Sequence, residues 1–191
     1  MGSYLDRIGA GLILSSAEVF GFDYIPDDLV GREDIQGQLA SIFSNLAHPE
    51  GTSRAVVTGP VGSGKTVLVK RFCIDIEKHL AEKRNIKTVH VNCRNAATAS
   101  RVMQKIVQDL DPGHPDRGLG VGELLTSLRR MMKGANSHLI VVLDEVDHLL
   151  RQSGDDVIYK LMRIDEDRDK AGTLSLILIS QEQAVSYTHL R

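Results

Sequence analysis

Apolar and polar positions follow two periods along this chain, and stretches of the two periods alternate. From residue 65 onward, apolar residues recur every fourth position, as on one face of a helix. These residues are Leu68, Phe72, Ile76 and Leu80. Short, continuously apolar runs follow the helical patterns, which predicts βα units. Runs this apolar are typical of a parallel sheet covered on both faces, so we predict a three-layer α/β fold with a parallel sheet and helices on both faces.

The individual elements can be placed from these periods. The predicted strands lie at residues 55–58, 88–92, 139–143 and 174–180. The predicted helices lie at residues 35–46, from 65 to about 80, at 97–110, at 123–132 and at about 155–168. The first of these helices is amphipathic, and Glu33 and Asp34 near its start are acids where the helix dipole favours negative charge.

A glycine-rich stretch joins the first strand to the helix that begins at residue 65. It reads Gly59-Pro60-Val61-Gly62-Ser63-Gly64-Lys65-Thr66 and fits the pattern G-x-x-x-x-G-K-[ST] at every required position. In a strand-loop-helix context, backbone N–H groups of such a loop bind phosphates, Lys65 neutralises their charge, and the Thr66 hydroxyl binds Mg²⁺. The alternative is a glycine-rich turn without a ligand, which leaves Lys65 without a purpose. We therefore predict a P-loop that binds ATP and Mg²⁺.

Two acids follow the strand at residues 139–143. Because Asp144 and Glu145 stand at the end of a buried strand, we expect them to serve a cation. Asp144 is predicted to hold Mg²⁺, and Glu145 to polarise the water that attacks the γ-phosphate. The alternative is that these acids, with Asp147, only cap the next segment. Together with the P-loop, the pair predicts hydrolysis as well as binding, with Lys65 and Glu145 as catalytic residues.

Gln181 follows the last predicted strand. Strand ends on this side of a parallel sheet line the ligand crevice, so Gln181 is predicted to contact the γ-phosphate or to orient the attacking water. The alternative is a loop residue that faces solvent. No two of the seven histidines share a metal-binding spacing, so we interpret them, His90 and His148 included, as surface or packing residues.

Composition limits the function classes that remain. The chain has 191 residues, 42% of them apolar, which suits one sizeable core. The chain has 23 Lys and Arg and 25 Asp and Glu, which gives a net charge of −2. Any contact with nucleic acid therefore needs a local basic patch. Few aromatic residues argue against a surface that stacks single strands. The two cysteines suit reduced thiols, and no signal peptide or membrane span is recognised, so we expect a cytoplasmic protein without a membrane partner.

The motifs together resemble the AAA+ ATPases, and within them the archaeal replication initiators related to origin recognition complex subunit one and cell division control protein six. The general resemblance rests on the P-loop, the strand with its two acids, and Gln181. The narrower resemblance rests on further stretches: Val19-Phe20, Tyr24-Ile25-Pro26, Gly31-Arg32-Glu33, Val91-Asn92-Cys93-Arg94, Pro115-Asp116-Arg117-Gly118-Leu119-Gly120 and Glu123-Leu124-Leu125. One departure is that the family usually has Asn at the position of Gln181.

The resemblance implies further site residues. It implies that Tyr24, Ile25 and Pro26, together with the Arg32-Glu33 pair, cover the adenine. It also places DNA contacts in a helical zone after the second strand, where Arg94, Arg101 and Lys105 are the candidates. The alternative for these three basic residues is a solvated helix face.

The resemblance also implies a division of the chain. Residues 1–34 are expected to cover the nucleotide, residues 35–184 to form an AAA+ core that is incomplete at its C-terminal end, and residues 185–191 to be a tail outside the native fold. Family members continue into an arginine finger, a helical lid and a winged-helix domain, so we expect an N-terminal fragment.

The function that the resemblance implies is ATP-controlled initiation of DNA replication. ATP acts as a switch, and the implied partners are double-stranded origin DNA, bound mainly by the winged-helix domain, the replicative helicase and other initiator subunits. A different class remains open: an AAA+ ATPase of a transposition-helper, signalling or protein-remodelling type. A third possibility is a nucleotide-binding module that hydrolyses too slowly to act as an enzyme, since arginine residues supplied in trans provide much of the rate in related reactions.

Overall fold

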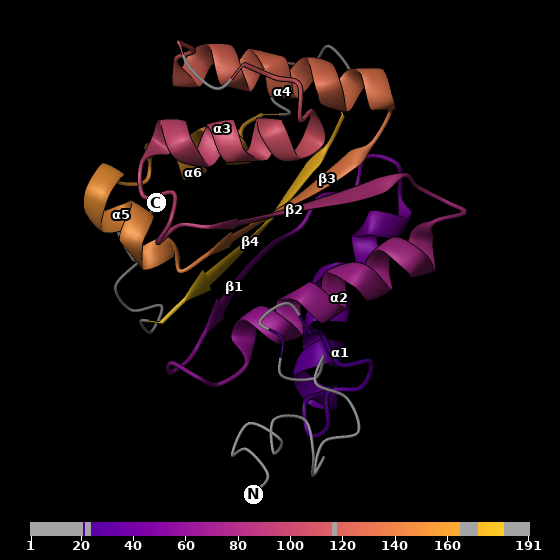
Figure 1. Ribbon diagram of the computed structural model, residues 1–191. Helices are drawn as coiled ribbons and strands as arrows, with labels where there is room; N and C mark the ends of the chain where they lie inside the picture. The colour runs from indigo at the N-terminus through magenta and orange to yellow at the C-terminus, as the bar shows by residue number, and fades with distance from the viewer. Residues whose placement is uncertain (1–20, 22–23, 116–117, 165–171, 182–191) are drawn as a thin grey trace, which may run out of the picture.

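Four parallel strands form the centre of the protein (Figure 1). The computed structural model describes residues 21, 24–115, 118–164 and 172–181. The strands are β1 (Arg54–Thr58), β2 (Ile86–Asn92), β3 (His138–Asp144) and β4 (Leu174–Ser180). Their order in the sheet is β1-β4-β3-β2. All four predicted strands are confirmed.

Helices connect and cover these strands. The helices are α1 (Glu33–Ile42), α2 (Lys65–Leu80), α3 (Ala99–Leu110), α4 (Val121–Ala135), α5 (Val146–Ser153) and α6 (Asp156–Met162), and a 3-10 helix, η3, spans Ser44–Ala47. The helix predicted at 35–46 is thus divided, because after Ile42 the backbone tightens to a 3-10 turn in which the Leu46 N–H donates to the Phe43 carbonyl. The helix predicted at 155–168 ends at Met162, and residues 165–168 lie outside the described part. The sequence patterns did not predict α5.

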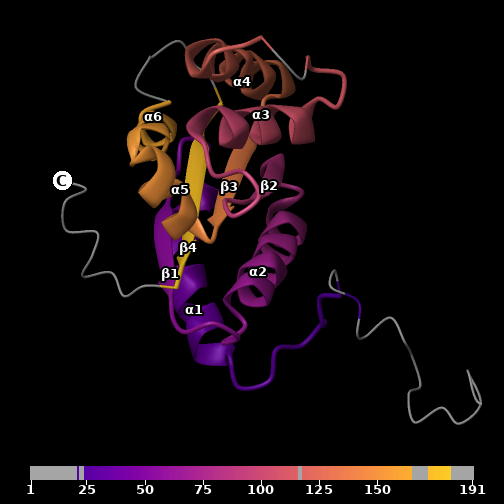
Figure 2. The ribbon, with the colours of Figure 1, turned by 60° about the vertical axis from the view of Figure 1, so that its left-hand side comes forward.

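The apolar side chains of the strands point alternately to the two faces of the sheet. Helices cover both faces, which gives three layers (Figure 2). In β3, Ile140 and Val142 pack on the side of α1 and α2. On the other side, Leu139, Val141 and Leu143 pack with residues of α3, α4, α5 and α6. Every residue of β3 and β4 is buried. The predicted three-layer α/β fold with helices on both faces is therefore confirmed.

The carboxyl ends of the four strands meet at one edge of the sheet. The end of β2 lies beside the end of β3, where Asn92 pairs with Asp144, and the end of β1 lies beside the end of β4, where Thr58 pairs with Ser180. The residues that follow these strands therefore share one crevice. Within the described residues, β1 is an outer strand, and its Val56 is 52% exposed.

A polar network lies at the opposite end of the sheet, where the strands begin. The Arg84 guanidinium donates to backbone carbonyls at residues 46, 48, 49 and 51 and to the Thr173 hydroxyl. His138 is buried between the hydroxyls of Thr173 and Ser175, with its nitrogens 2.7 and 3.0 Å away from their oxygens. Burial, and then the nearby charge of Arg84, lower the pKa of His138 to about 3. This histidine is therefore neutral at physiological pH.

The two cysteines fit the expectation of reduced thiols. Cys73 and Cys93 are free and buried, and burial raises the pKa of both thiols to about 12, so they are unreactive at neutral pH. None of the described helices is long and apolar enough to cross a membrane. The expected boundary between residues 34 and 35 falls inside α1, and the expected tail at 185–191 lies outside the described residues.

Candidate functional site

The glycine-rich loop runs from the end of β1 into the first turn of α2. Gly62 and Gly64 have φ angles of 77° and 81°, in the left-handed region that glycine adopts without strain. Gly64 is the N-cap residue of α2, so the loop ends where the amides of a helix N-terminus have no helical acceptor. A loop with these features can bind phosphate oxygens through its backbone N–H groups.

Lys65, the first residue of α2, folds back over the loop. Its Nζ donates to the carbonyl oxygens of Gly59 and Pro60, at 2.8 Å in each case. A phosphate is a stronger acceptor for an ammonium group than a neutral carbonyl. The contacts of Lys65 can therefore be exchanged for contacts with a ligand.

A cavity of about 280 Å³ lies over the loop and the ends of β3 and β4. Its lining residues are Val61, Gly62, Ser63, Gly64, Lys65, Thr66, Val67, Asp144, Glu145, Ile179, Ser180 and Gln181. The structure thus brings together most of the predicted loop residues, both acids and Gln181. Gly59 and Pro60 contribute through their carbonyl contacts with Lys65.

The residues expected to cover the adenine lie to one side of this cavity. Tyr24 is 42% exposed, and Ile25 and Pro26 are half-buried. None of the three lines the cavity within the described part of the chain. The carboxylate of Asp27, which follows them, pairs with Arg71 on α2 at 2.8 Å. This ion pair joins the segment to α2 at Asp27, and the adenine contact of Tyr24, Ile25 and Pro26 stays a prediction.

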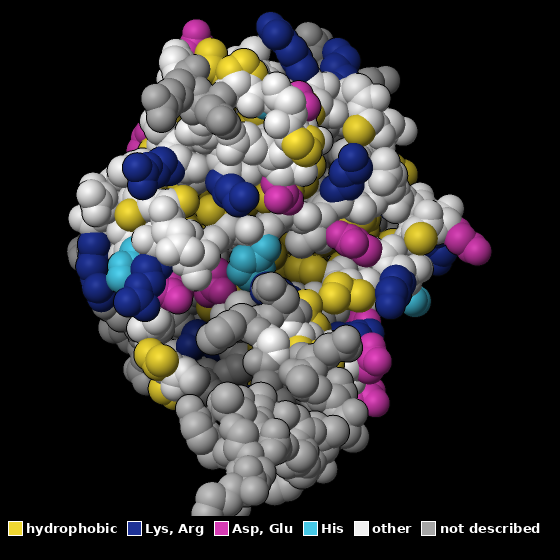
Figure 3. Space-filling view, viewed as in Figure 1, with side chains coloured by type: hydrophobic (Ala, Val, Ile, Leu, Met, Phe, Trp, Pro, Cys, Tyr) yellow, Lys and Arg dark blue, Asp and Glu magenta, His cyan; other side chains and the backbone are white. Residues whose placement is uncertain are grey.

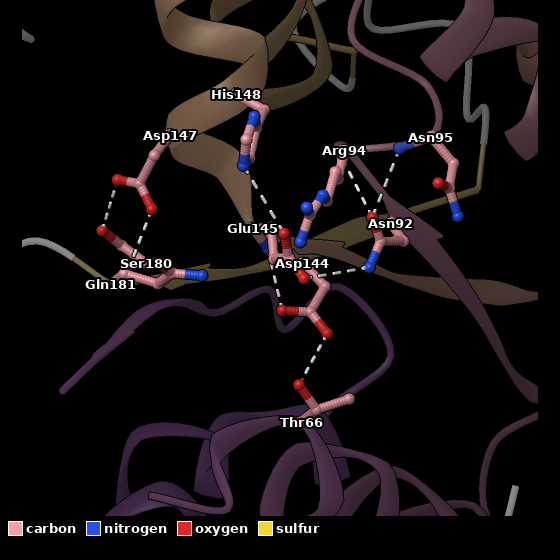
Figure 4. Close-up of polar contacts among 10 residues, drawn as sticks. All are labelled: Thr66, Asn92, Arg94, Asn95, Asp144, Glu145, Asp147, His148, Ser180 and Gln181. Carbon is pink, nitrogen blue, oxygen red and sulfur yellow. Dashed lines mark hydrogen bonds and ion pairs between the residues drawn. The ribbon is translucent and has the colours of Figure 1, made fainter. Parts of the chain in front are cut away.

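Asp144 links the sheet to the loop (Figure 4). Its Oδ2 accepts from the Thr66 hydroxyl at 2.7 Å and lies 3.2 Å from His90 Nε2, and its Oδ1 accepts from the backbone N–H of Glu145 at 2.8 Å. Burial acts to raise the pKa of this carboxyl. The hydrogen bonds from His90 and Thr66 outweigh burial, so the pKa lies below its ordinary value of 3.8. Asp144 is therefore ionised at neutral pH.

The donor set of Thr66 and Asp144 fits Mg²⁺. Both residues offer oxygen atoms, one of them charged, and the two side chains already lie within hydrogen-bonding distance. Mg²⁺ takes only one or two protein carboxylates and completes its octahedron with waters and substrate phosphates. Among the described residues, no three or more His, Cys, Asp or Glu side chains form a possible metal site. This is compatible with a Mg²⁺ site that uses one carboxylate and one hydroxyl.

Glu145 has an unusual backbone and an unusual side-chain environment. Its φ of 50° puts it in the left-handed region, where it is the N-cap residue of α5. Its Oε1 accepts from Asn92 Nδ2 at 3.5 Å, and its Oε2 lies 3.6 Å from His148 Nε2. That distance is longer than a hydrogen bond, and Oε2 is buried without a hydrogen-bond partner in the described part of the structure. A buried oxygen of this kind can accept a hydrogen bond from a water molecule.

Asp147, which the sequence suggested only as a capping residue, fixes the end of β4. Its Oδ1 accepts from the Ser180 hydroxyl at 2.7 Å, and its Oδ2 accepts from the backbone N–H of Gln181 at 2.9 Å. These bonds hold Gln181 at the rim of the cavity (Figure 4). The role of Gln181 toward a phosphate stays a prediction.

Two of the histidines that the sequence suggested to be surface or packing residues, His90 and His148, lie beside the two acids, and each keeps part of its side chain exposed. His90 contacts Asp144, and His148 lies beside Glu145. Among the described residues, neither histidine belongs to a group of three or more possible metal ligands. Asn92 also belongs to the site, and a signal was present: it is a polar residue at the end of a predicted strand, as are Asp144 and Gln181.

The three candidate DNA-contacting residues are all exposed. Arg101 and Lys105 lie one turn apart on α3, whose N-cap Thr98 accepts from the Arg101 N–H, whereas Arg94 lies in the turn after β2. Figure 3 shows acidic side chains interspersed among the basic ones on the face that it presents. These positions suit a local contact and also suit a solvated helix face.

A parallel sheet with a phosphate-type loop after β1 and an acidic pair at the end of β3 defines the class of P-loop nucleotide-binding proteins. The family model described as "AAA domain" matches residues 49–187. The chain belongs to this AAA family.

Within the family, the chain is similar to replication proteins of archaea. It is 33% identical over 179 residues to the ORC1-type DNA replication protein of Desulfurococcus amylolyticus, covering 93% of this chain and 45% of that protein. Its identity to the ORC1-type protein of Thermococcus kodakarensis is also 33%, over 89% of this chain and 42% of the relative. The chain thus spans less than half the length of these relatives.

Solved structures agree with this relationship. The Aeropyrum pernix ORC1 protein in complex with DNA matches with a TM-score of 0.77 and 29% identity, over 88% of this chain and 43% of that one. The Aeropyrum pernix ORC2 protein, solved as ADPNP-ADP complexes, matches with a TM-score of 0.81 and 26% identity, over 93% and 48% of the two chains. The resemblance to archaeal initiators of the origin recognition complex subunit one type is therefore confirmed.

Proposed function

We propose that this chain binds and hydrolyses ATP as the nucleotide switch of a DNA replication initiator. The observation that carries the proposal is the 2.7 Å contact between Thr66 and Asp144, which joins the phosphate-type loop to the end of β3 with Glu145 as the next residue. In this proposal the intact protein recognises double-stranded origin DNA and helps to load the replicative helicase. Similarity to ORC1-type DNA replication proteins favours this function over remodelling or signalling.

Phosphate binding uses the loop and Lys65. The ammonium group leaves the carbonyls of Gly59 and Pro60 for the β- and γ-phosphates, while the loop amides donate to phosphate oxygens. Tyr24, Ile25 and Pro26 cover the adenine, as the family resemblance implies. Support for a nucleotide comes from the similar Aeropyrum pernix ORC2 protein, which was solved as ADPNP-ADP complexes.

Metal binding uses Thr66 and Asp144. When bound there, Mg²⁺ neutralises charge on the phosphates and so favours attack at phosphorus. Asp144 suits this task because its carboxyl stays ionised at neutral pH. His90 supports the carboxylate from the neighbouring strand at 3.2 Å.

Hydrolysis uses Glu145 as the group that accepts a hydrogen bond from the attacking water. Glu145 lines the cavity, its Oε2 has no hydrogen-bond donor among the described residues, and Asn92 and His148 limit how far the carboxylate can rotate. Gln181, held by Asp147, contacts the γ-phosphate or the same water. The end of β4 is thereby sensitive to whether the γ-phosphate is present, which is the requirement for a switch.

Contact with DNA is proposed for Arg94, Arg101 and Lys105, with most of the affinity coming from a winged-helix domain outside this chain. All three side chains are exposed, and the similar Aeropyrum pernix ORC1 protein was solved in complex with DNA.

A DNA-binding titration of the intact protein tests the proposal. Origin-like and unrelated duplexes are compared at one salt concentration, with ATP and Mg²⁺, with ADP and Mg²⁺, and without nucleotide. We expect the origin-like duplex to bind at least about ten times more tightly than the unrelated one, and this ratio to depend on the nucleotide. Equal affinity for both duplexes under all three conditions would contradict the initiator function and favour a protein-directed AAA+ ATPase.

A further inference from the structure

Arg32 makes a contact that the nucleotide-binding motif does not explain. It is the N-cap residue of α1, and its side chain crosses to the phosphate-type loop, where Nη2 donates to the Ser63 carbonyl at 2.7 Å. The residues are 31 positions apart in the sequence. A charged donor to a backbone carbonyl forms a strong hydrogen bond, so this contact fixes the position of one peptide group of the loop.

The turn that carries Arg32 is itself well defined. Gly31 has a φ of 72°, and its N–H donates to the Glu33 carboxylate at 3.1 Å. The N–H of Arg32 donates to the carbonyl of Leu29 at 3.2 Å. The guanidinium therefore projects from a turn with its own hydrogen bonds, immediately before a helix, and not from an unsupported loop.

The geometry of the peptide bond gives this contact a consequence for phosphate binding. The Ser63 carbonyl and the Gly64 N–H belong to one planar peptide group, and none of the described peptide bonds is cis. In a trans peptide the C=O and the N–H point in opposite directions. By holding the Ser63 oxygen, Arg32 sets the direction of the Gly64 N–H, and Gly64 lines the cavity.

We propose that Arg32 is a positioning residue that orients the Ser63–Gly64 peptide group for phosphate binding, without itself touching the nucleotide. This inference rests on the proposed binding of ATP at the loop. It assigns to Arg32 a role different from covering the base, because its guanidinium lies against a loop carbonyl. The orienting effect applies to any ligand whose phosphates reach the Gly64 amide, whatever its base.

The test is the affinity of the intact protein for ATP, ADP and GTP, measured by competition against a fluorescent ATP analogue. The variant Arg32→Ala removes the donor, and Arg32→Lys keeps the charge and one donor group. Arg130→Ala is the matched control, since Arg130 is an exposed arginine on α4, which packs on the face of the sheet opposite to α1 and α2. Thermal unfolding without nucleotide shows whether each variant is folded.

For Arg32→Ala we expect the dissociation constants of ATP, ADP and GTP to rise by the same factor, about tenfold, as for the loss of one charge-assisted hydrogen bond. Arg32→Lys is expected to recover part of this loss. For Arg130→Ala we expect a change below about twofold, because its side chain is exposed on a helix that does not line the cavity. If Arg32→Ala is unfolded, the comparison of Arg32→Lys with the wild type decides.

Three results would overturn the inference. A loss confined to ATP would place Arg32 on the terminal phosphate, and a loss confined to the adenine nucleotides would place it on the base. Wild-type affinity in Arg32→Ala would show that the loop needs no external support. Failure of the wild-type protein to bind ATP is a separate outcome, because it removes the proposed function itself.

Discussion

At the scale of single residues, the site depends on two neighbouring acids with different environments. Asp144 is hydrogen-bonded from three directions and stays ionised, whereas the Oε2 of Glu145 is buried without a hydrogen bond among the described residues. The first environment stabilises a charge that serves a cation. The second leaves an acceptor ready for a water molecule. Two residues of nearly the same chemistry are thereby suited to different tasks.

Replacing Glu145 by Gln should separate binding from hydrolysis. The amide keeps the shape of the side chain but is a much weaker base. We therefore expect the ATP dissociation constant to stay within about twofold and the hydrolysis rate to fall about a hundredfold or more, as for the loss of a general base.

The measurement is ATP binding by titration, with phosphate release at saturating ATP, both in the presence of Mg²⁺. The matched control is Glu82→Gln, since Glu82 is an exposed glutamate just beyond α2. Normal turnover in Glu145→Gln would show that another group activates the water. Lys65→Ala, in contrast, should abolish binding, because the loop loses its only ammonium group.

At the scale of elements, α3 offers a test of the proposed DNA contact. Arg101 and Lys105 lie one helical turn apart on its exposed side, and Asp109 lies one turn further. We expect Arg101→Ala with Lys105→Ala to weaken binding to all duplexes alike. The slope of log K against log salt should become shallower by about 0.9 for each DNA phosphate that the variant no longer neutralises.

The measurement is duplex binding by the intact protein over a series of salt concentrations. Lys83→Ala is the control, because Lys83 is exposed just beyond α2, which packs on the opposite face of the sheet. An unchanged slope in the double variant would return Arg101 and Lys105 to the role of a solvated helix face.

The elements also show what the sequence could and could not predict. β3 and β4 were predictable because they are buried along their whole length, and most of their residues are therefore apolar. Helix α5 was not, because it starts directly after the strand at the left-handed Glu145, without the Gly or Pro that usually marks a turn. The loop and the acids after β3 could be predicted since each is a short local pattern.

Contacts between strands were beyond the reach of such patterns. Asn92 stands opposite Asp144 only because β2 pairs with β3, and the sequence does not give the order of strands in the sheet. The same holds for Asp147, whose partners Ser180 and Gln181 are more than 30 positions away, and for the contact of Arg32 with Ser63. Residues that join distant segments carry no local signature.

At the scale of the whole molecule, the polar network at the end of the sheet where the strands begin makes stability depend on pH. The pKa of His138 is lowered from 6.5 to about 3 in the folded protein. Between these values the unfolded chain binds a proton that the folded chain does not. The contribution of neutral, buried His138 to the free energy of unfolding is therefore complete above about pH 6.5. As the pH falls below that value, the free energy of unfolding falls by up to about 1.4 kcal/mol for each pH unit.

Urea unfolding at pH 7.5 and pH 5.5 measures this dependence. We expect the free energy of unfolding to fall by about 1 kcal/mol more in the wild type than in His138→Gln, which cannot take up the proton. Asp144 does not change the free energy of unfolding between pH 5.5 and pH 7.5. Its stabilising contribution is complete above its ordinary pKa of 3.8 and is lost only at lower pH. An equal fall in both proteins would show that His138 is not the group responsible.

The open side of β1 has a consequence for how the isolated chain behaves in concentrated solution. Among the described residues this strand pairs only with β4, and its half-exposed Val56 sits on a side where backbone N–H and C=O groups have no strand partner. Such an edge is a template for a strand from another molecule. Where no other segment covers this edge, we expect chains at high concentration to associate by edge-to-edge strand pairing, which light scattering at rising protein concentration would detect.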